Sequence, residues 1–101
     1  MQIELTYEEI TEQATKTITE FMTQAKSADS RYSADFFYHA AWGVRMFWLD
    51  LTAPIRNDSG CKPDLFFAIK KQSEIFEQLV NRESVPALNK GAEGQWNENV
   101  R

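Results

Sequence analysis

The chain has 101 residues and a formal net charge of −4, with 11 Lys and Arg against 15 Asp and Glu. This length fits one domain, and the acidic balance argues against general binding to duplex DNA, which requires a basic footprint. Cys61 is the single cysteine and cannot form an intrachain disulfide. We see neither a secretory signal nor the roughly 18 consecutive apolar residues of a membrane span, and therefore expect a cytoplasmic protein.

The first predicted helix runs from Thr6 to about Ala28. Thr6 is a suitable N-cap, and Glu9 three residues later completes a capping box. The apolar residues fall in one sector about 120° wide, which predicts a buried stripe. They are Tyr7, Ile10, Ala14, Ile18, Phe21, Met22 and Ala25. Beside them lies a ladder of Thr11, Thr15, Thr19 and Thr23. We interpret the ladder as a solvated flank, with a hydroxyl-rich contact strip as the alternative.

The second predicted helix covers residues 33–52, after a polar turn. It should end before Pro54, because the residue before a proline avoids the helical region. Two helices joined by a short turn predict an antiparallel hairpin. One wide face of the second helix is predicted to build the hairpin core. Its residues are Phe36, Phe37, Ala40, Ala41, Val44, Phe47, Trp48 and Leu51.

The opposite face of the second helix is too apolar for the surface of a monomer. Its residues are Asp35, Tyr38, His39, Trp42, Arg45, Met46, Leu49 and Asp50. Either the third helix and the tail cover this face, or a second subunit does. We favour a second subunit, because aromatic residues, Met and Arg are enriched at interfaces. Gly43 in mid-helix costs about 1 kcal/mol relative to Ala. It indicates close approach of another backbone or a ligand, unless the site merely tolerates it.

A third amphipathic helix is predicted over residues 63–83, with Pro63 in its first turn. Its buried face would hold Leu65, Ala68, Ile69, Gln72, Ile75, Phe76, Leu79 and Val80. Residues 84–101 are polar and predict a flexible tail, in which Trp96 is either an anchor or an exposed side chain. The predicted fold is all-α: a helical domain over residues 1–83, made of an antiparallel hairpin and a third helix, in a homo-oligomeric bundle.

The second helix also carries the candidate binding residues. Asp35 and His39 are four residues apart and can touch, which would fix the histidine tautomer. His39, Trp42 and Arg45 lie on neighbouring turns, where they could stack a base and hold a phosphate. The alternative is a structural histidine with charges at the rim of an interface. The sequence has no nucleophile triad, metal-ligand spacing or glycine-rich phosphate loop. We therefore expect no enzyme activity, no metal and no cofactor.

Residues 5–54 resemble the helical hairpin of small phage anti-defence proteins that act as cyclic-nucleotide sponges against CBASS and Thoeris immunity. The residues that carry the resemblance are Leu5, Thr6, Glu8, Glu9 and Ile10 at the helix start, Asp29, Arg31 and Tyr32 in the turn, and His39, Gly43, Phe47, Leu51 and Pro54. Tyr38, Arg45 and Leu49 stand where the family usually has Thr, a hydrophobic residue and a basic residue.

The resemblance implies homo-oligomers whose subunit interfaces bind cyclic di- or trinucleotides, or cyclic ADP-ribose type signals, without cleaving them. A phage-encoded protein of this kind would act in the host cytoplasm. The expected ligand-binding residues are Arg31, Tyr38, His39, Trp42, Arg45 and Arg56. Arg31 and Arg45 would meet phosphates, Tyr38 and Trp42 would stack bases, and Arg56 would reach in from the following loop.

Two other functions fit the same sequence. The protein could be a small acidic helical inhibitor or immunity protein that binds a host protein complex directly. Its contact patch would then be Tyr38, Trp42, Met46 and Leu49. Alternatively, the patch could be only the interface of a structural homodimer, in which case Arg45→Ala would change assembly and no binding activity.

Overall fold

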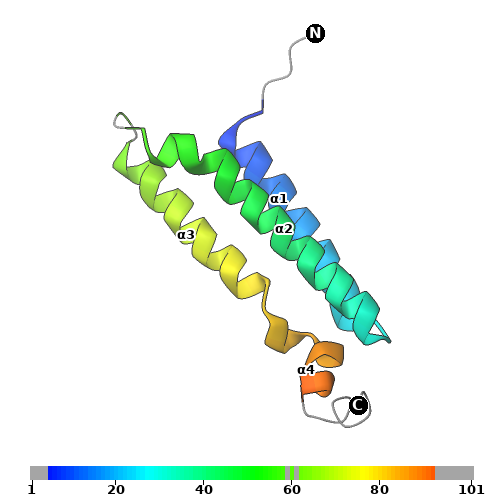
Figure 1. Cartoon of the computed structure of the whole chain (residues 1–101). Helices are drawn as coiled ribbons and strands as arrows, with labels where there is room; N and C mark the ends of the chain where they lie inside the picture. The colour runs from blue at the N-terminus through cyan, green and yellow to red at the C-terminus, as the bar shows by residue number, and fades with distance from the viewer. Residues whose placement is uncertain (1–4, 59, 61, 93–101) are drawn as a thin grey trace.

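The computed structural model describes residues 5–58, 60 and 62–92, and their regular structure is helical throughout. Figure 1 shows the helices in chain order. They are α1 (Tyr7–Ser27), α2 (Arg31–Arg56), α3 (Pro63–Leu79), the short 3-10 helix η1 (Arg82–Ser84) and α4 (Pro86–Ala92). The all-helical class predicted from the sequence is confirmed.

The predicted capping box is present at the start of α1. The Thr6 hydroxyl accepts a hydrogen bond from the Glu9 amide at 3.1 Å, and the Glu9 carboxylate accepts one from the Thr6 amide at 2.9 Å. Two of the amides that a helix start leaves unpaired are thereby satisfied.

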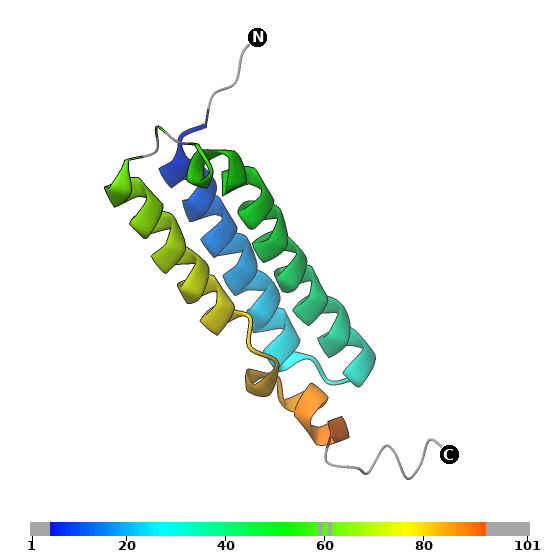
Figure 2. The same ribbon diagram turned by 60° about the vertical axis from the view of Figure 1, so that its left-hand side comes forward.

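Helices α1 and α2 run in opposite directions and lie side by side (Figures 1 and 2). Near one end, the indole of Trp48 on α2 donates to the hydroxyl of Thr11 on α1 at 2.9 Å. Near the other end, the rings of Phe21 and Phe37 have centroids 6.3 Å apart. The centre of the apolar stripe predicted for α1 is buried between these contacts, at Ala14, Ile18, Met22 and Ala25.

The threonine ladder of α1 does not lie wholly in solvent. Thr11 is buried and binds Trp48, so interpreting this position as part of a solvated flank was wrong. Thr19 and Thr23 are exposed as expected, and the Thr23 hydroxyl donates to the backbone carbonyl of Thr19. The helical periodicity placed Thr11 beside the apolar stripe of α1. It could not predict that the Thr11 hydroxyl accepts a hydrogen bond from the indole N–H of Trp48.

Helix α2 continues one turn past the predicted end, through Pro54 to Arg56. A proline inside a helix leaves the carbonyl four residues earlier without a donor, here that of Asp50. Both Asp50 and Pro54 are exposed, so water can satisfy that carbonyl. In the preceding turn, Thr52 donates to the carbonyl of Trp48 and Arg56 to that of Leu49, each at 3.0 Å.

The core face predicted for α2 is right at its centre and wrong at its edge. Ala41 and Trp48 are buried, together with Ala34. Phe36 and Phe47 are exposed instead, and so is Leu51. The cause is tertiary: α1 and α3 both pack on the sector that contains Ala34, Ala41 and Trp48, and the two phenylalanines lie outside that sector.

The segment after α3 is more ordered than the sequence predicts. Helix α3 ends at Leu79 rather than near residue 83, and η1 and α4 follow. Val85 and Leu88 are fully buried, so the predicted flexible tail is wrong for residues 84–92. Trp96 and the rest of residues 93–101 lie outside the described part of the chain.

The molecule is long and thin, with extents of 55 × 31 × 18 Å. Figures 1 and 2 show that α1 and α3 lie beside α2, and that α4 lies at one end of the molecule. Neither α3 nor α4 surrounds α2, and a long face of α2 stays open to solvent.

Candidate functional site

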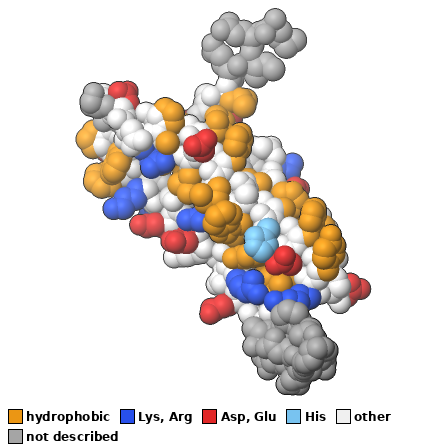
Figure 3. Space-filling model, viewed as in Figure 1, with side chains coloured by type: hydrophobic (Ala, Val, Ile, Leu, Met, Phe, Trp, Pro, Cys, Tyr) orange, Lys and Arg blue, Asp and Glu red, His pale blue; other side chains and the backbone are white. Residues whose placement is uncertain are grey.

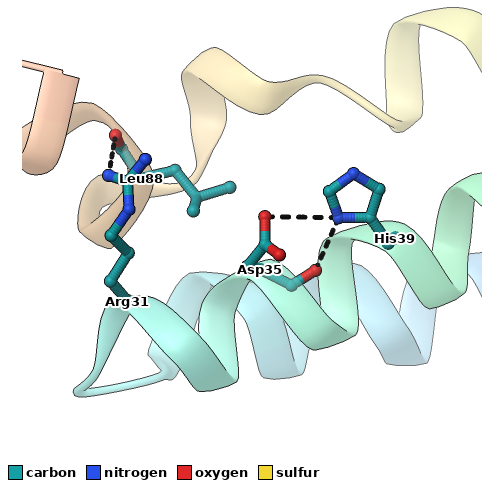
Figure 4. Close-up of polar contacts among 4 residues, drawn as sticks. All are labelled: Arg31, Asp35, His39 and Leu88. Atoms are coloured by element: carbon teal, nitrogen blue, oxygen red, sulfur yellow. Dashed lines mark hydrogen bonds and ion pairs between the residues drawn. The ribbon is translucent and has the colours of Figure 1, made fainter.

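His39 is held by the turn of α2 that precedes it (Figure 4). Its Nδ1 lies 2.9 Å from the backbone carbonyl of Asp35 and 3.3 Å from the Asp35 carboxylate. The Asp35–His39 contact predicted from their spacing is therefore present. A carbonyl oxygen accepts only from a protonated nitrogen, so Nδ1 carries a proton and Nε2 of the neutral ring is left to accept. The imidazole is more than half exposed and offers that Nε2 outward.

Tyr38 and Trp42 flank the histidine. The rings of Tyr38 and His39 meet edge to face, with centroids 5.1 Å apart and an interplanar angle of 82°. Tyr38 is half-buried against the core, whereas Trp42, one turn further along, is 43% exposed. A largely rigid indole with this much free surface is suited to stacking on a flat ligand or a protein side chain.

Arg45 lies one turn beyond Trp42 and leans toward α3. Its side chain is 17% exposed, and its Nη2 lies 3.9 Å from the Glu77 carboxylate. Its Nε is buried and has no hydrogen-bond partner within the described chain. A buried guanidinium N–H without a partner is costly, and the Nε of Arg56 is in the same situation. We call Tyr38, His39, Trp42 and Arg45 the aromatic–arginine cluster.

Arg31 and Arg56 do not join the cluster. The Arg31 guanidinium donates to the backbone carbonyl of Leu88 at 3.3 Å, which ties the start of α2 to α4 (Figure 4). Arg56 lies in the last turn of α2 rather than in a loop, and donates to the Leu49 carbonyl. At 1.5 Å per residue, Arg31 and Arg56 stand about 21 Å and about 16 Å along the helix from Arg45. Within one chain, the three arginines cannot reach the same small ligand.

An open hollow lies on the outer surface of α2, beside the aromatic–arginine cluster. Its volume is about 420 Å³, and its lining is Tyr32, Asp35, Phe36, His39 and Ala40. His39 is the member that it shares with the cluster. The sequence pattern placed Phe36 and Ala40 in the core and Tyr32 in the turn, so it did not predict that these three residues line one hollow. Tyr32, Phe36 and Ala40 follow one another at intervals of four residues. This spacing was a signal that they share one side of α2, outside its buried sector.

The face seen in Figure 3 has hydrophobic side chains over both α2 and α3, with charged side chains between them. On α3, Phe66, Phe67, Ile75 and Leu79 are exposed to a third or more of their surface. Only part of the apolar face predicted for α3 is buried, at Ile69, Phe76 and Val80. Uncovered apolar area of this extent is typical of proteins that bind something else.

Within residues 5–58, 60 and 62–92, no group of three or more His, Cys, Asp or Glu side chains is placed to hold a metal ion. No helix of the described part of the chain is long and apolar enough to cross a membrane.

Comparisons with family models, with curated proteins and with solved structures gave no match to this chain. The resemblance of residues 5–54 to the sponge family stays a prediction.

Proposed function

We propose that the protein acts by binding rather than by catalysis, as a phage-type anti-defence sponge that sequesters a cyclic nucleotide messenger. The observation that carries the proposal is the aromatic–arginine cluster on α2. It combines an exposed indole, an outward imidazole nitrogen and a partly exposed guanidinium within two turns of helix. Bases stack on such rings, and phosphates bind such cations.

The mechanism of sequestration is mass action. A protein that binds a messenger tightly lowers its free concentration below the level that activates the host effector, and needs no bond-breaking group. Of the three arginines predicted to bind the ligand, only Arg45 belongs to the cluster, because Arg31 and Arg56 are remote. A ligand with two or three phosphates would therefore require cations from more than one copy, which agrees with the homo-oligomer that the resemblance implies.

Calorimetry against a panel of cyclic di- and trinucleotides and cyclic ADP-ribose isomers tests the proposal. The wild type should give heat and a raised melting temperature with at least one ligand. Trp42→Ala should weaken binding about ten-fold or more, the expected effect of losing one stacked ring. The matched control is Phe67→Ala, which removes an exposed ring on α3 outside the cluster. Absence of heat and of thermal shift with every ligand would sink the proposal.

A second function is favoured by the exposed apolar residues next to the cluster. Trp42 and Met46 are 43% and 40% exposed, and Leu49 is half-buried beside them. These residue types form hot spots at protein interfaces, and an acidic protein suits a basic partner. A host protein that co-purifies stoichiometrically, survives nuclease and phosphodiesterase treatment, and is lost with Met46→Glu would favour an inhibitor or immunity protein over a sponge.

A further inference from the structure

The outer surface of α2 carries a row of uncharged residues whose spacing is the same in both directions along the chain. Successive members are four, four, three, four and four residues apart. The row, called here the outer stripe, consists of Tyr32, Phe36, Ala40, Gly43, Phe47 and Leu51. Small residues occupy its centre, aromatic rings lie on both sides of them, and Tyr32 and Leu51 end it.

The outer stripe is uncovered in the single chain. Tyr32 is 83% exposed, Phe36 59%, Phe47 63% and Leu51 42%. A Cβ atom built at Gly43 would meet no heavy atom within 4 Å. The close approach that a mid-helix glycine suggests is therefore not made by the described residues of the same chain, and another molecule must make it if it exists.

We propose that a second copy of this chain packs its α2 antiparallel on the outer stripe, about a two-fold axis between Ala40 and Gly43. A two-fold interface uses the same patch on both copies, so the patch must be complementary to itself. Reversing the helix superimposes the outer stripe on itself. Phe36 then faces Phe47 of the second copy, Tyr32 faces Leu51, and Ala40 faces Gly43. This spacing lets the same patch serve on both copies, as a two-fold interface requires.

Side-chain size also fits this pairing. Ala40 and Gly43 allow the two backbones to approach at the axis, and the phenylalanines fill the space on either side. With roughly 100 Å² exposed on each of the four large residues, the two copies would bury about 800 Å² from these side chains alone. This is a large share of the roughly 1,200–2,000 Å² of a specific interface. None of the six residues is itself charged, and the exposed Asp35 and Asp50 lie beside the outer stripe, where they would border the interface.

Sedimentation equilibrium of the full-length protein tests the interface without reference to any nucleotide. We expect the wild type to have twice the chain mass of 11.7 kDa. Phe47→Glu should raise the dissociation constant by at least about 30-fold, since it places a charge at a hot spot of both copies. The control is Phe67→Glu on α3, where the ring is equally exposed, at 61%. It should remain dimeric.

The centre of the outer stripe provides a second variant that does not threaten the fold. Gly43→Leu introduces a better helix former into open space of the single chain, so the monomer should fold at least as well as the wild type. The same side chain would separate the two backbones at the axis, so association should again weaken. A Gly43→Leu protein that dimerises like the wild type would overturn the proposal.

Cross-linking tests the register. In a Cys61→Ser background, a mixture of Ala40→Cys and Gly43→Cys chains should oxidise mainly to the mixed disulfide dimer. A wild type that stays monomeric at about 100 μM contradicts the proposal, because a dissociation constant above that value is too weak for a specific pair. It is equally contradicted if Phe67→Glu dissociates the protein and Phe47→Glu does not, or if the mixed disulfide is absent. Each of these results is independent of whether a nucleotide binds.

Discussion

At the scale of single residues, the contact between Trp48 and Thr11 is a buried side-chain hydrogen bond that joins α2 to α1. Trp48 is the largest fully buried side chain, and its ring also packs edge to face on Phe76 of α3, with centroids 5.0 Å apart. A buried indole N–H needs an acceptor, and Thr11 provides it at 2.9 Å. This one ring thus connects α1, α2 and α3.

Thr11→Val should lower the free energy of unfolding by about 1–3 kcal/mol, because it keeps the shape of the side chain but leaves the indole N–H buried without an acceptor. Urea denaturation followed by circular dichroism measures the change. The control is Thr19→Val, an exposed threonine of the same helix, which should alter stability by less than about 0.5 kcal/mol. Equal losses for the two variants would contradict the assigned role of Thr11.

Tyr7 gives the core a dependence on pH. Burial raises the pKa of Tyr7 above its ordinary value of 10.0; the charge of Glu8 adds to this, and a hydrogen bond with Thr11 opposes it. The folded state therefore favours the neutral phenol. The stability that follows from this is fully present below pH 10 and is lost as the pH rises through the folded-state pKa.

Between pH 9 and pH 11, the free energy of unfolding of the wild type should therefore fall more steeply than that of Tyr7→Phe. Urea titrations at a series of pH values give both slopes. If Tyr7→Phe also matches the wild type, burial of this phenol has no effect on stability.

At the scale of helices, α4 is an element that the sequence does not reveal. It has seven residues, and an isolated helix of this length is unstable in water. Its order comes from contacts with residues far away in the chain: Leu88 and Val85 are buried, and the Leu88 carbonyl binds Arg31 from 57 residues earlier. Composition and periodicity describe neighbours along the chain, so they predicted a flexible tail here.

Leu88→Ala should lower the free energy of unfolding by about 2–4 kcal/mol, the usual cost of a cavity at a buried leucine. It should also remove hydrogen-exchange protection from the amides of α4 before those of α1 and α2. Leu79→Ala is the matched control, because Leu79 is 36% exposed. A Leu88→Ala protein with unchanged stability and protection would show that α4 does not dock as described.

Helix α2 shows what the periodicity of a sequence can predict and what it cannot. The periodicity correctly predicted the centre of the buried sector, Ala41 and Trp48, and the contact between Asp35 and His39, because both follow from spacing along one helix. The edge of the sector depends on where α1 and α3 lie around α2, and no spacing within α2 contains that information. Phe36 and Phe47 were therefore assigned to the core although both are exposed.

At the scale of the whole molecule, the arrangement of the helices explains why so much of α2 is open. Helices α1, α3 and α4 pack on part of the circumference of α2 and leave the rest to solvent (Figures 1 and 2). The sequence indicated that the chain alone leaves apolar surface on α2, and this holds, although the uncovered surface extends to the outer stripe as well as to Trp42 and Met46. Only the contacts within α2 could be predicted for the candidate site. The placement of Arg31 could not, because it depends on the position of α4.

Trp42 and Trp48 lie in different environments, so their fluorescence can be distinguished. Trp48 is 1% exposed and Trp42 43% exposed, so their emission should differ in wavelength and in access to acrylamide. In a Trp96→Phe background, acrylamide should quench one fraction of the fluorescence readily and leave another almost untouched. Unfolding would then be followed through the protected fraction. Occupation of the aromatic–arginine cluster, by nucleotide or protein, would be followed through the accessible one, without any label on the chain.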